Sequence, residues 1–488
     1  MGGVVLLTRP LSLLGTIALA RLLDPTDFGQ VALVLVLLGT SHLFVGLGMA
    51  PAVVHSEKET SGVSYHAFIV TLISGTIIFS VLFLNAGWVV SILGDVDVDL
   101  FRHLLPLVLI TALSIVPDAL LQKSLLFGRI SLAGLISDFS YFVVTIILAL
   151  LDFGVWSLVY GRLASALILM ILTWVFNPNW VWLKRTIWDW SLLKDLMSYG
   201  LRSTGSGTVA YFHSHWDDWF VGRHFGSQSL GYYSKSYDLS NSTLSTLSGA
   251  IVAKVFFPTY TRIRNDHERT KHVYLRSLQF VLLMMTPLAL GLLVLAPEIV
   301  EVLLGPKWLP MTNTLMVFCI MALMLPVSRN AVPVFQAMGR PQYNLYAGIV
   351  LSIVMVPLIL LLAPYEIVGV AVAVVISHTI GAAFNVYLLE TLLPGTLWPT
   401  IRMSLLYLML GGVMVLAVAL MKPVVGHYVG DVASLLSLII LVGIGAITYC
   451  GLALITQKEL ILELIDLAKI VLNRGEQTST SVVQEVGN

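Results

Sequence analysis

The chain has 488 residues, of which 57% are hydrophobic and only 11% are charged, and its formal net charge is zero. Soluble domains contain about 25% charged residues, so the composition excludes a water-exposed protein of this size and requires lipid to cover much of the surface. The neutral balance gives no reason to expect nucleic acid as a partner.

Long apolar runs separated by turn residues extend along the whole chain. A membrane-spanning helix needs about 20 mostly apolar residues, and fourteen such runs can be counted, with turn residues such as Asp24-Pro25 and Asn177-Pro178 between them. We therefore predict an all-α membrane protein with about fourteen transmembrane helices. The predicted spans are residues 3–20, 28–50, 66–93, 103–121, 132–150, 155–175, 200–221, 232–256, 274–296, 311–333, 345–363, 369–390, 403–421 and 432–455.

Three segments are not expected to span the membrane. The connection 176–199 contains four tryptophans and several basic residues, a mixture typical of an amphipathic segment at the level of the lipid headgroups. Residues 458–474 repeat polar positions at helical spacing and are expected to form a short helix on the membrane surface. Residues 475–488 are polar and are expected to be disordered.

The distribution of Lys and Arg predicts the orientation in the membrane. Cytoplasmic loops carry an excess of these residues. With the N-terminus inside, the cytoplasmic segments hold sixteen and the outer loops five. We therefore expect both termini on the cytoplasmic side of the cell membrane. Because Arg21 and further spans follow the first apolar run directly, we expect no cleavable signal peptide.

Short motifs recur in the same order in the two halves of the chain. The pairs are Arg21 with Arg223, Gly29 with Gly231, Gly94 with Gly305, Gly128-Arg129 with Gly339-Arg340, and Gly154 with Gly369. The simplest interpretation is two six-helix lobes, 1–175 and 200–390, related as a parallel repeat by an axis along the membrane normal. Two extra transmembrane helices, 391–455, and a cytoplasmic tail, 456–488, complete the predicted organisation.

Several motifs of the chain resemble those of one transporter family. They are ARLLDPTDFG at 20–29, LGMA at 47–50, QKSLLF at 122–127, FFP at 256–258, LGPKW at 304–308 and QAMGRP at 336–341. Over roughly residues 9–400 the chain resembles the polysaccharide and O-antigen (Wzx-like) flippases of the multidrug/oligosaccharidyl-lipid/polysaccharide exporter superfamily. The resemblance implies a twelve-helix core and export of lipid-linked sugars. Family members usually have a cytoplasmic segment before the first span, whereas here that span begins almost at Met1, so we expect a short or truncated first helix.

Ionisable side chains within spans mark candidate functional sites, because they are costly in lipid and usually face a cavity or a partner. Arg9, Lys254 and Arg276 lie near span ends, where a long side chain can also reach the headgroups. Arg329 lies deeper, between Pro326 and Pro333, where a broken helix could line a cavity. We take all four as candidate substrate-binding residues.

The eighth predicted span carries a polar stripe. Ser234, Asp238, Asn241, Ser245 and Ser248 are spaced by four, three, four and three residues, which places them on one helical face with Lys235 beside them. Such a face either forms hydrogen bonds to neighbouring helices or lines a central hydrophilic cavity. The cavity interpretation makes Lys235, Asp238, Asn241 and Ser245 candidate substrate-binding residues.

The seventh predicted span carries His213, Asp217 and Asp218, with His215 between them. Either the two aspartates cap the outer end of the helix near Arg223, or these side chains form a cation or proton site. In the second interpretation His213, Asp217 and Asp218 are candidate ion-coupling residues.

The leading functional hypothesis is a flippase that moves a lipid-linked oligosaccharide or polysaccharide precursor across the cytoplasmic membrane by alternating access. Basic side chains in a cavity would pair with the diphosphate of such a substrate, whose charges cannot cross a bilayer core unaided. The alternatives are a multidrug or small-cation exporter of the same superfamily and a membrane glycan polymerase. A polysaccharide polymerase and glycosyltransferases are expected partners of a flippase.

Enzyme signatures are missing from the sequence. It contains no Walker A motif, no H-E-x-x-H and no cluster of Cys and His with metal-ligand spacing. We therefore expect a transporter without a cofactor or a metal centre, and not an enzyme.

Overall fold

The computed structural model describes residues 2–56, 60–177, 180, 188–242, 257–429, 434–458 and 460, with the backbone alone for 2–11, 242, 257 and 258. Within these residues all regular secondary structure is helical. The prediction of an all-α protein is therefore confirmed. The polar tail 475–488 and most of the surface helix predicted at 458–474 lie outside the described residues.

The helices form two compact units. Unit 1 contains residues 1–239, 303–317 and 348–377, and unit 2 contains residues 240–302, 318–347 and 378–488. These units are groups of helices in mutual contact. The two six-helix lobes expected from the sequence repeat remain a prediction.

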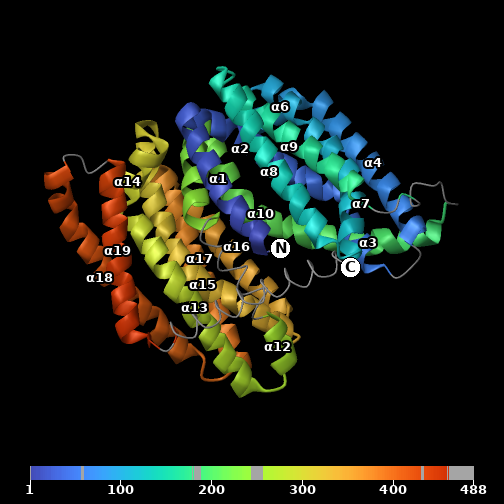
Figure 1. Ribbon diagram of the computed structural model, residues 1–488. Coiled ribbons are helices and arrows are strands. Elements are labelled where there is room, and N and C mark those ends of the chain that lie inside the picture. Colours follow the sequence, from blue (N-terminus) through green and yellow to red (C-terminus); the bar gives the residue numbers. More distant parts are fainter. Residues whose placement is uncertain are drawn as a thin grey trace, which may run out of the picture. The chain divides into compact units, whose positions relative to one another are not determined.

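Unit 1 is built mainly from the first ten helices, which contact one another in pairs (Figure 1). The long helix α10 packs along α2, and α8 packs along α9. The helices are α1 Gly2–Leu22, α2 Pro25–Gly46, α3 Met49–His55, α4 Thr60–Leu84, α5 Ala86–Leu93, α6 Val98–Leu104, α7 Pro106–Lys123, α8 Phe127–Leu150, α9 Val155–Val175 and α10 Trp190–Tyr237.

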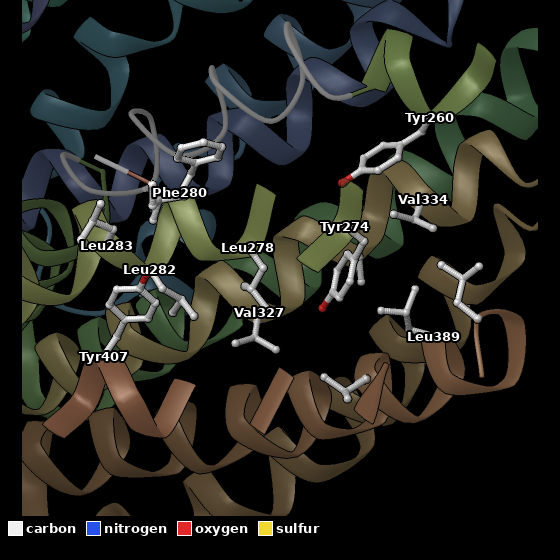
Figure 2. Close-up of a cluster of buried hydrophobic side chains, with 14 of the residues drawn as sticks. Tyr260, Tyr274, Leu278, Phe280, Leu282, Leu283, Val327, Val334, Leu389 and Tyr407 are labelled. Carbon is white, nitrogen blue, oxygen red and sulfur yellow. The ribbon is translucent and has the colours of Figure 1, made fainter. Parts of the chain in front are cut away.

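The second half of the chain supplies the remaining helices, some of which pass from one unit into the other. They are α12 Phe257–Ile263, α13 His267–Val294, α14 Ala296–Ile299, α15 Thr312–Ala337, α16 Gln342–Leu362, α17 Glu366–Leu392, α18 Leu397–Val429 and α19 Leu435–Thr456, with the π-helical turns η2 Asp238–Ser242 and η4 Val300–Leu304 and the 3-10 turn η5 Pro306–Met311. The core of unit 2 is apolar. In Figure 2, Leu278 of α13 and Val327 of α15 face each other within this core.

Ten helical stretches of the described chain are long and apolar enough to cross a membrane. One of them, Gln342–Leu392, contains both α16 and α17, which correspond to two predicted spans. The chain is therefore a multi-pass membrane protein. The number of fourteen crossings remains a prediction, because residues 243–256, which make up most of the eighth predicted span, are outside the described part.

The polar segment 222–231, predicted as a loop between two spans, is a one-residue kink. Helix α10 runs from Trp190 to Tyr237, and only Gly226, with φ 84° and ψ 171°, departs from helical geometry. Glycine adopts such a positive φ without a steric penalty. After the kink, the Asp95 carboxylate accepts a hydrogen bond of 2.6 Å from the Ser227 hydroxyl and one of 3.4 Å from the Ser227 amide. The predicted break between two spans is therefore present at Gly226, but it is shorter than the predicted loop, because the Asp95 carboxylate holds the start of the following helical part.

The order and length of the helices recur between the two halves. In the first half a long helix, α4, is interrupted at Asn85 and continues as the short α5, which ends at Gly94. In the second half α13 is interrupted at Leu295 and continues through α14 and η4 to Gly305. Both glycines have a positive φ, 103° and 100°, although their ψ angles differ, −114° and 167°.

Two glycines that the repeat pairs with each other lie at the crossing of α2 and the second part of α10. A Cβ atom on Gly29 would be 1.7 Å from the carbonyl oxygen of Ser227, and one on Gly231 would be 1.9 Å from that of Pro25. Backbone therefore packs directly against backbone at this crossing. Small residues permit such close approach between membrane helices.

We expect Gly231→Ala to destabilise the protein by about 1–3 kcal/mol or more, because the added methyl group meets a backbone atom that cannot rotate away. The measurement is the unfolding midpoint of the purified protein in detergent. Gly205→Ala is the matched control, since it lies on the same helix and no atom comes within 4 Å of its added Cβ. Equal midpoints for the two variants would show that the crossing is looser than described.

Candidate functional site

The candidate ion-coupling residues lie on the first part of α10. Asp217 is buried, and the Tyr233 hydroxyl donates a hydrogen bond of 2.7 Å to its Oδ2. Asp218 lies 3.2 Å from Nδ1 of His215. Two neighbouring carboxylates therefore have different partners, one a neutral donor and the other an imidazole that can carry charge.

The position of these aspartates excludes one of the two interpretations of the sequence. Because the first part of α10 continues past Asp217 and Asp218 to the kink at Gly226, neither residue lies at a helix end. The bond from Tyr233 to Asp217 instead joins the two parts of α10 across the kink at Gly226. A change in the charge of Asp217 would thus act directly on the kink.

His213 does not join this cluster. Its Nδ1 lies 2.9 Å from the hydroxyl of Ser352 on α16, within unit 1. His213 and Asp217 are four residues apart and so share a helical face, whereas the structure gives the two side chains different partners. Tyr233 and Ser352 were missed, because each is brought to its partner by tertiary packing and neither type of residue is unusual in a membrane helix.

Lys235 and Asp238 are one helical turn apart at the end of α10 and the start of η2. The ammonium group of Lys235 lies 4.2 Å from the centre of the Phe28 ring, a cation–π geometry. Asp238 is exposed. These two residues belong to unit 1.

Asn241 of the polar stripe and the basic candidates Arg276 and Arg329 belong to unit 2. Asn241 is buried, and among the described residues neither atom of its amide group finds a hydrogen-bond partner. Arg329 is exposed on α15, which has Pro326 and Pro333 inside it as the sequence indicates. An arginine inside an apolar helix is rare and marks a candidate functional site.

Arg276 has a local role that the sequence did not reveal. It donates a hydrogen bond of 2.9 Å from Nη1 to Oε1 of Gln279, whose amide group bonds Gln457 at 2.7 Å. This chain of polar groups connects α13 to the end of α19 within unit 2. Arg276 is thus engaged in packing between helices at the end of its span.

Three candidates cannot be placed. Ser245 and Lys254 lie outside the described residues, and only the backbone of Arg9 is described, within α1. Among the described residues no group of three or more His, Cys, Asp or Glu side chains is arranged to hold a metal ion.

A set of contacts that the sequence did not predict joins the connection after α1 to the segment 303–308. We call it the interloop contact, and it comprises Arg21, Asp24, Lys307 and Trp308. Arg21 Nε donates to the Leu303 carbonyl at 3.0 Å, and Lys307 Nζ lies 3.2 Å from Asp24 Oδ1. All of these residues belong to unit 1.

Trp308 is the buried centre of the interloop contact. Its side chain is fully buried, and its indole nitrogen donates a hydrogen bond of 2.7 Å to the carbonyl of Ala20. The rings of Phe28 and Tyr232 meet it edge-on at 5.5 and 6.1 Å. A buried aromatic group with a satisfied N–H gives this contact far more energy than its exposed ion pair does.

Comparison with known proteins identifies the family of the chain. Residues 18–313 match the model of a family described as "Polysaccharide biosynthesis protein". The chain belongs to this family. This agrees with the resemblance predicted from its motifs.

Individual relatives have low sequence identity to the chain but match it over long segments. The chain is 24% identical over 393 residues to a membrane protein in the cps region of Klebsiella pneumoniae, covering 78% of each chain. It is 25% identical over 294 residues to the succinoglycan biosynthesis transport protein ExoT of Rhizobium meliloti, covering 59% of this chain and 58% of ExoT.

The fold of this family member is that of a solved transporter. The structure titled "Lipid II flippase MurJ, inward closed conformation" is similar with a TM-score of 0.77 at 14% identity, covering 94% of this chain and 99% of MurJ. At this identity the likeness concerns the fold alone. It agrees with the predicted multi-helix membrane architecture.

Proposed function

We propose that this family member is a flippase that moves a lipid-linked oligosaccharide or polysaccharide precursor across the cytoplasmic membrane by alternating access. The observation that carries the proposal is the match to the polysaccharide biosynthesis family over residues 18–313. The names of ExoT, a transport protein, and of MurJ, a flippase, agree with it. No chemistry is required of the chain, so transport and not catalysis is its activity.

The transported molecule would be held by groups already described. Arg329 and Lys235 would pair with the diphosphate, while Asp238 and Asn241 would hydrogen-bond sugar hydroxyls. Arg9, Ser245, Lys254 and Arg276 complete the proposed set, which we place around one central cavity between two lobes. Asp217, Asp218 and His213 are the proposed ion-coupling residues, with Asp217 acting on the kink of α10.

Two lobes, 1–175 and 200–390, are the proposed moving parts. The recurrence of the helix order, with a positive-φ glycine at Gly94 and at Gly305, supports an internal repeat. The close packing of Gly29 against the segment around Gly231 is the contact expected near the axis that relates two such lobes. Residues 391–455 would form the two extra helices and 456–488 a cytoplasmic tail.

We further propose that both termini are cytoplasmic and that the interloop contact closes the outer side. The excess of Lys and Arg in the corresponding loops supports this orientation. With the outer side closed, the substrate would enter from the cytoplasm, where glycosyltransferases assemble it. A polysaccharide polymerase is the proposed partner on the outer side.

The proposal is tested by reconstitution. The purified protein is inserted into vesicles that contain a polyprenyl-diphosphate oligosaccharide with a fluorescent sugar, and a membrane-impermeant quencher reports which leaflet the sugar faces. We expect the protein to move the sugar between leaflets many-fold faster than protein-free vesicles do. If the rate equals that of protein-free vesicles while a fluorescent small cation is carried, the exporter alternative is correct instead.

A further inference from the structure

An apolar cavity of about 460 Å³ lies within unit 1, and none of the proposed substrate-binding residues lines it. Its walls come from α2, α4, α5 and α10, and aromatic rings dominate the lining, among them Trp88, Phe212, Trp216 and Trp219. The volume falls within the range of about 300–1,000 Å³ typical of ligand pockets. None of the functions proposed above uses this cavity.

The mouth of the cavity opens onto the membrane-facing surface of these helices. Trp88 and Phe212 line the cavity and are 68% and 56% exposed. On the neighbouring turns of α4, Ile77, Val81 and Leu84 are also exposed. Large apolar side chains on a spanning helix are covered by lipid, so hydrocarbon is what the cavity meets.

The face of α10 at the cavity carries aromatic side chains and one positively charged side chain. Phe212, Trp216, Trp219 and Arg223 are spaced by four, three and four residues, so they share one side of the helix. Three aromatic rings are thus followed by a cation. Trp216 stacks between Phe212 and Trp219, at 5.2 and 5.0 Å between ring centres.

The cation lies beside the end of α5, next to the residues that line the cavity. α5, whose Ile92 and Leu93 line the cavity, ends at Gly94, and Arg223 Cδ is 3.5 Å from where a Cβ atom on Gly94 would lie. The acidic loop that begins at Asp95 follows directly. Arg223 itself is exposed, so its guanidinium group can meet a headgroup.

The cavity wall also holds an unused hydrogen-bond donor. The indole nitrogen of Trp216 is buried and has no partner among the described residues. A buried tryptophan N–H normally finds an acceptor. Seven residues separate Trp216 from Arg223, which corresponds to about 10 Å along the helix.

We propose that this cavity binds one phospholipid of the surrounding bilayer. An acyl chain fills the aromatic cavity, an ester carbonyl accepts the hydrogen bond from Trp216, and the phosphate pairs with Arg223. Phospholipid is the occupant because the cavity opens to the bilayer and its polar contacts follow the order of groups along a phospholipid, from chain to ester to phosphate. The bound lipid would connect α5 to the first part of α10. The inference is independent of which molecule the protein transports.

Photocrosslinking of the full-length protein tests the site. The protein is reconstituted with a phosphatidylglycerol that carries a diazirine on one acyl chain, and labelled peptides are mapped by mass spectrometry. We expect labelling of 86–93 and 209–219 at least several-fold above the lipid-exposed stretch 353–361 of α16. Equal labelling of all three segments would mean ordinary bilayer contact and would overturn the proposal.

Two variants test the polar contacts. Trp216→Phe removes only the indole N–H, and Arg223→Gln removes only the charge. Each is expected to reduce labelling of 209–219 at least three-fold, whereas Arg402→Gln, an exposed arginine of unit 2, leaves it unchanged. Unlabelled phosphatidylglycerol should compete for the site; if undecaprenyl phosphate competes better, the occupant is an isoprenoid and the proposal is wrong.

Discussion

Replacing Arg329 by alanine is expected to reduce glycan export roughly 10- to 100-fold while the protein stays in the membrane at its normal level. A hydrogen bond to a charged group contributes about 1.5–3 kcal/mol, and each 1.4 kcal/mol is about a factor of ten in rate. Because Arg329 is exposed on α15, its truncation leaves no cavity in a packed core. Function should therefore fall without a loss of folded protein.

Arg329→Lys separates the charge of this residue from its shape. Lysine keeps the positive charge but loses the planar fork that binds two phosphate oxygens at once. We expect export between that of the wild type and that of the alanine variant. Arg340→Ala is the matched control, because Arg340 is an exposed arginine just after the same helix, and its export should be normal.

Export and membrane-protein level must be measured on the same cells. Normal export by Arg329→Ala, or a fall in protein level that accounts for the whole loss, would make Arg329 a structural residue. The reconstituted vesicle assay gives the same comparison without any dependence on expression.

Most of the helices could be predicted from the sequence because the membrane imposes a simple requirement on each span. A helix must be about 20 residues long and apolar. The local sequences of α8, α9 and α19 meet this requirement by themselves. Their observed limits lie within a few residues of the predicted ones. Charges within spans were equally visible, which is why Arg329 and Asp217 could be named in advance.

The kink in α10 could not be predicted from local signals. Residues 222–231 contain glycine, serine and charged side chains, a composition typical of a loop. Their helical state depends on Gly226 and on the hydrogen bonds that Ser227 makes to Asp95, which is 132 residues away. Nothing in the sequence connects these two positions.

The side chains that contact the candidate site residues could not be predicted from the sequence either. His213, Asp217 and Asp218 share a stretch of α10, but Tyr233 reaches Asp217 only because the helix bends, and Ser352 reaches His213 from another helix. Helical spacing predicts which residues share a face. It does not predict what that face meets.

The interloop contact also could not be predicted, although its residues were visible as a motif in the sequence. The motif LGPKW was noted for its family resemblance, and a tryptophan next to a lysine is typical of a membrane interface. In the structure Trp308 is instead fully buried against the end of α1. This burial leads to the second prediction with a large effect.

Trp308→Ala is expected to open the outer side of the protein. Truncating a buried tryptophan costs about 3–5 kcal/mol, and that cost falls on the closed state, in which Trp308 packs between Phe28 and Tyr232. If the open state lies a few kcal/mol above the closed one, as is common for two-state proteins, it becomes a major population. Trp308→Phe keeps a ring and loses one hydrogen bond worth about 1 kcal/mol, so it should have a smaller effect.

Opening can be measured by thiol labelling of a residue beneath the contact. Ser236 is fully buried, and its hydroxyl bonds the carbonyl of Met311 at 3.2 Å. In a background with Cys319 and Cys450 replaced by alanine, Ser236→Cys should react with a membrane-impermeant reagent in intact cells when Trp308 is alanine, and at least ten-fold more slowly when it is tryptophan.

Two controls distinguish gating from loss of structure and from a wrong orientation. Phe335→Ala removes another fully buried aromatic ring, from the core of unit 2, and should lower stability without raising the reactivity of a cysteine at 236. Asp266→Cys, in a loop assigned to the cytoplasm, should stay unlabelled in every background. Labelling at 266 would reverse the proposed orientation. If Trp308→Ala lowers the amount of protein but leaves the cysteine at 236 unreactive, the interloop contact stabilises the fold and does not gate it.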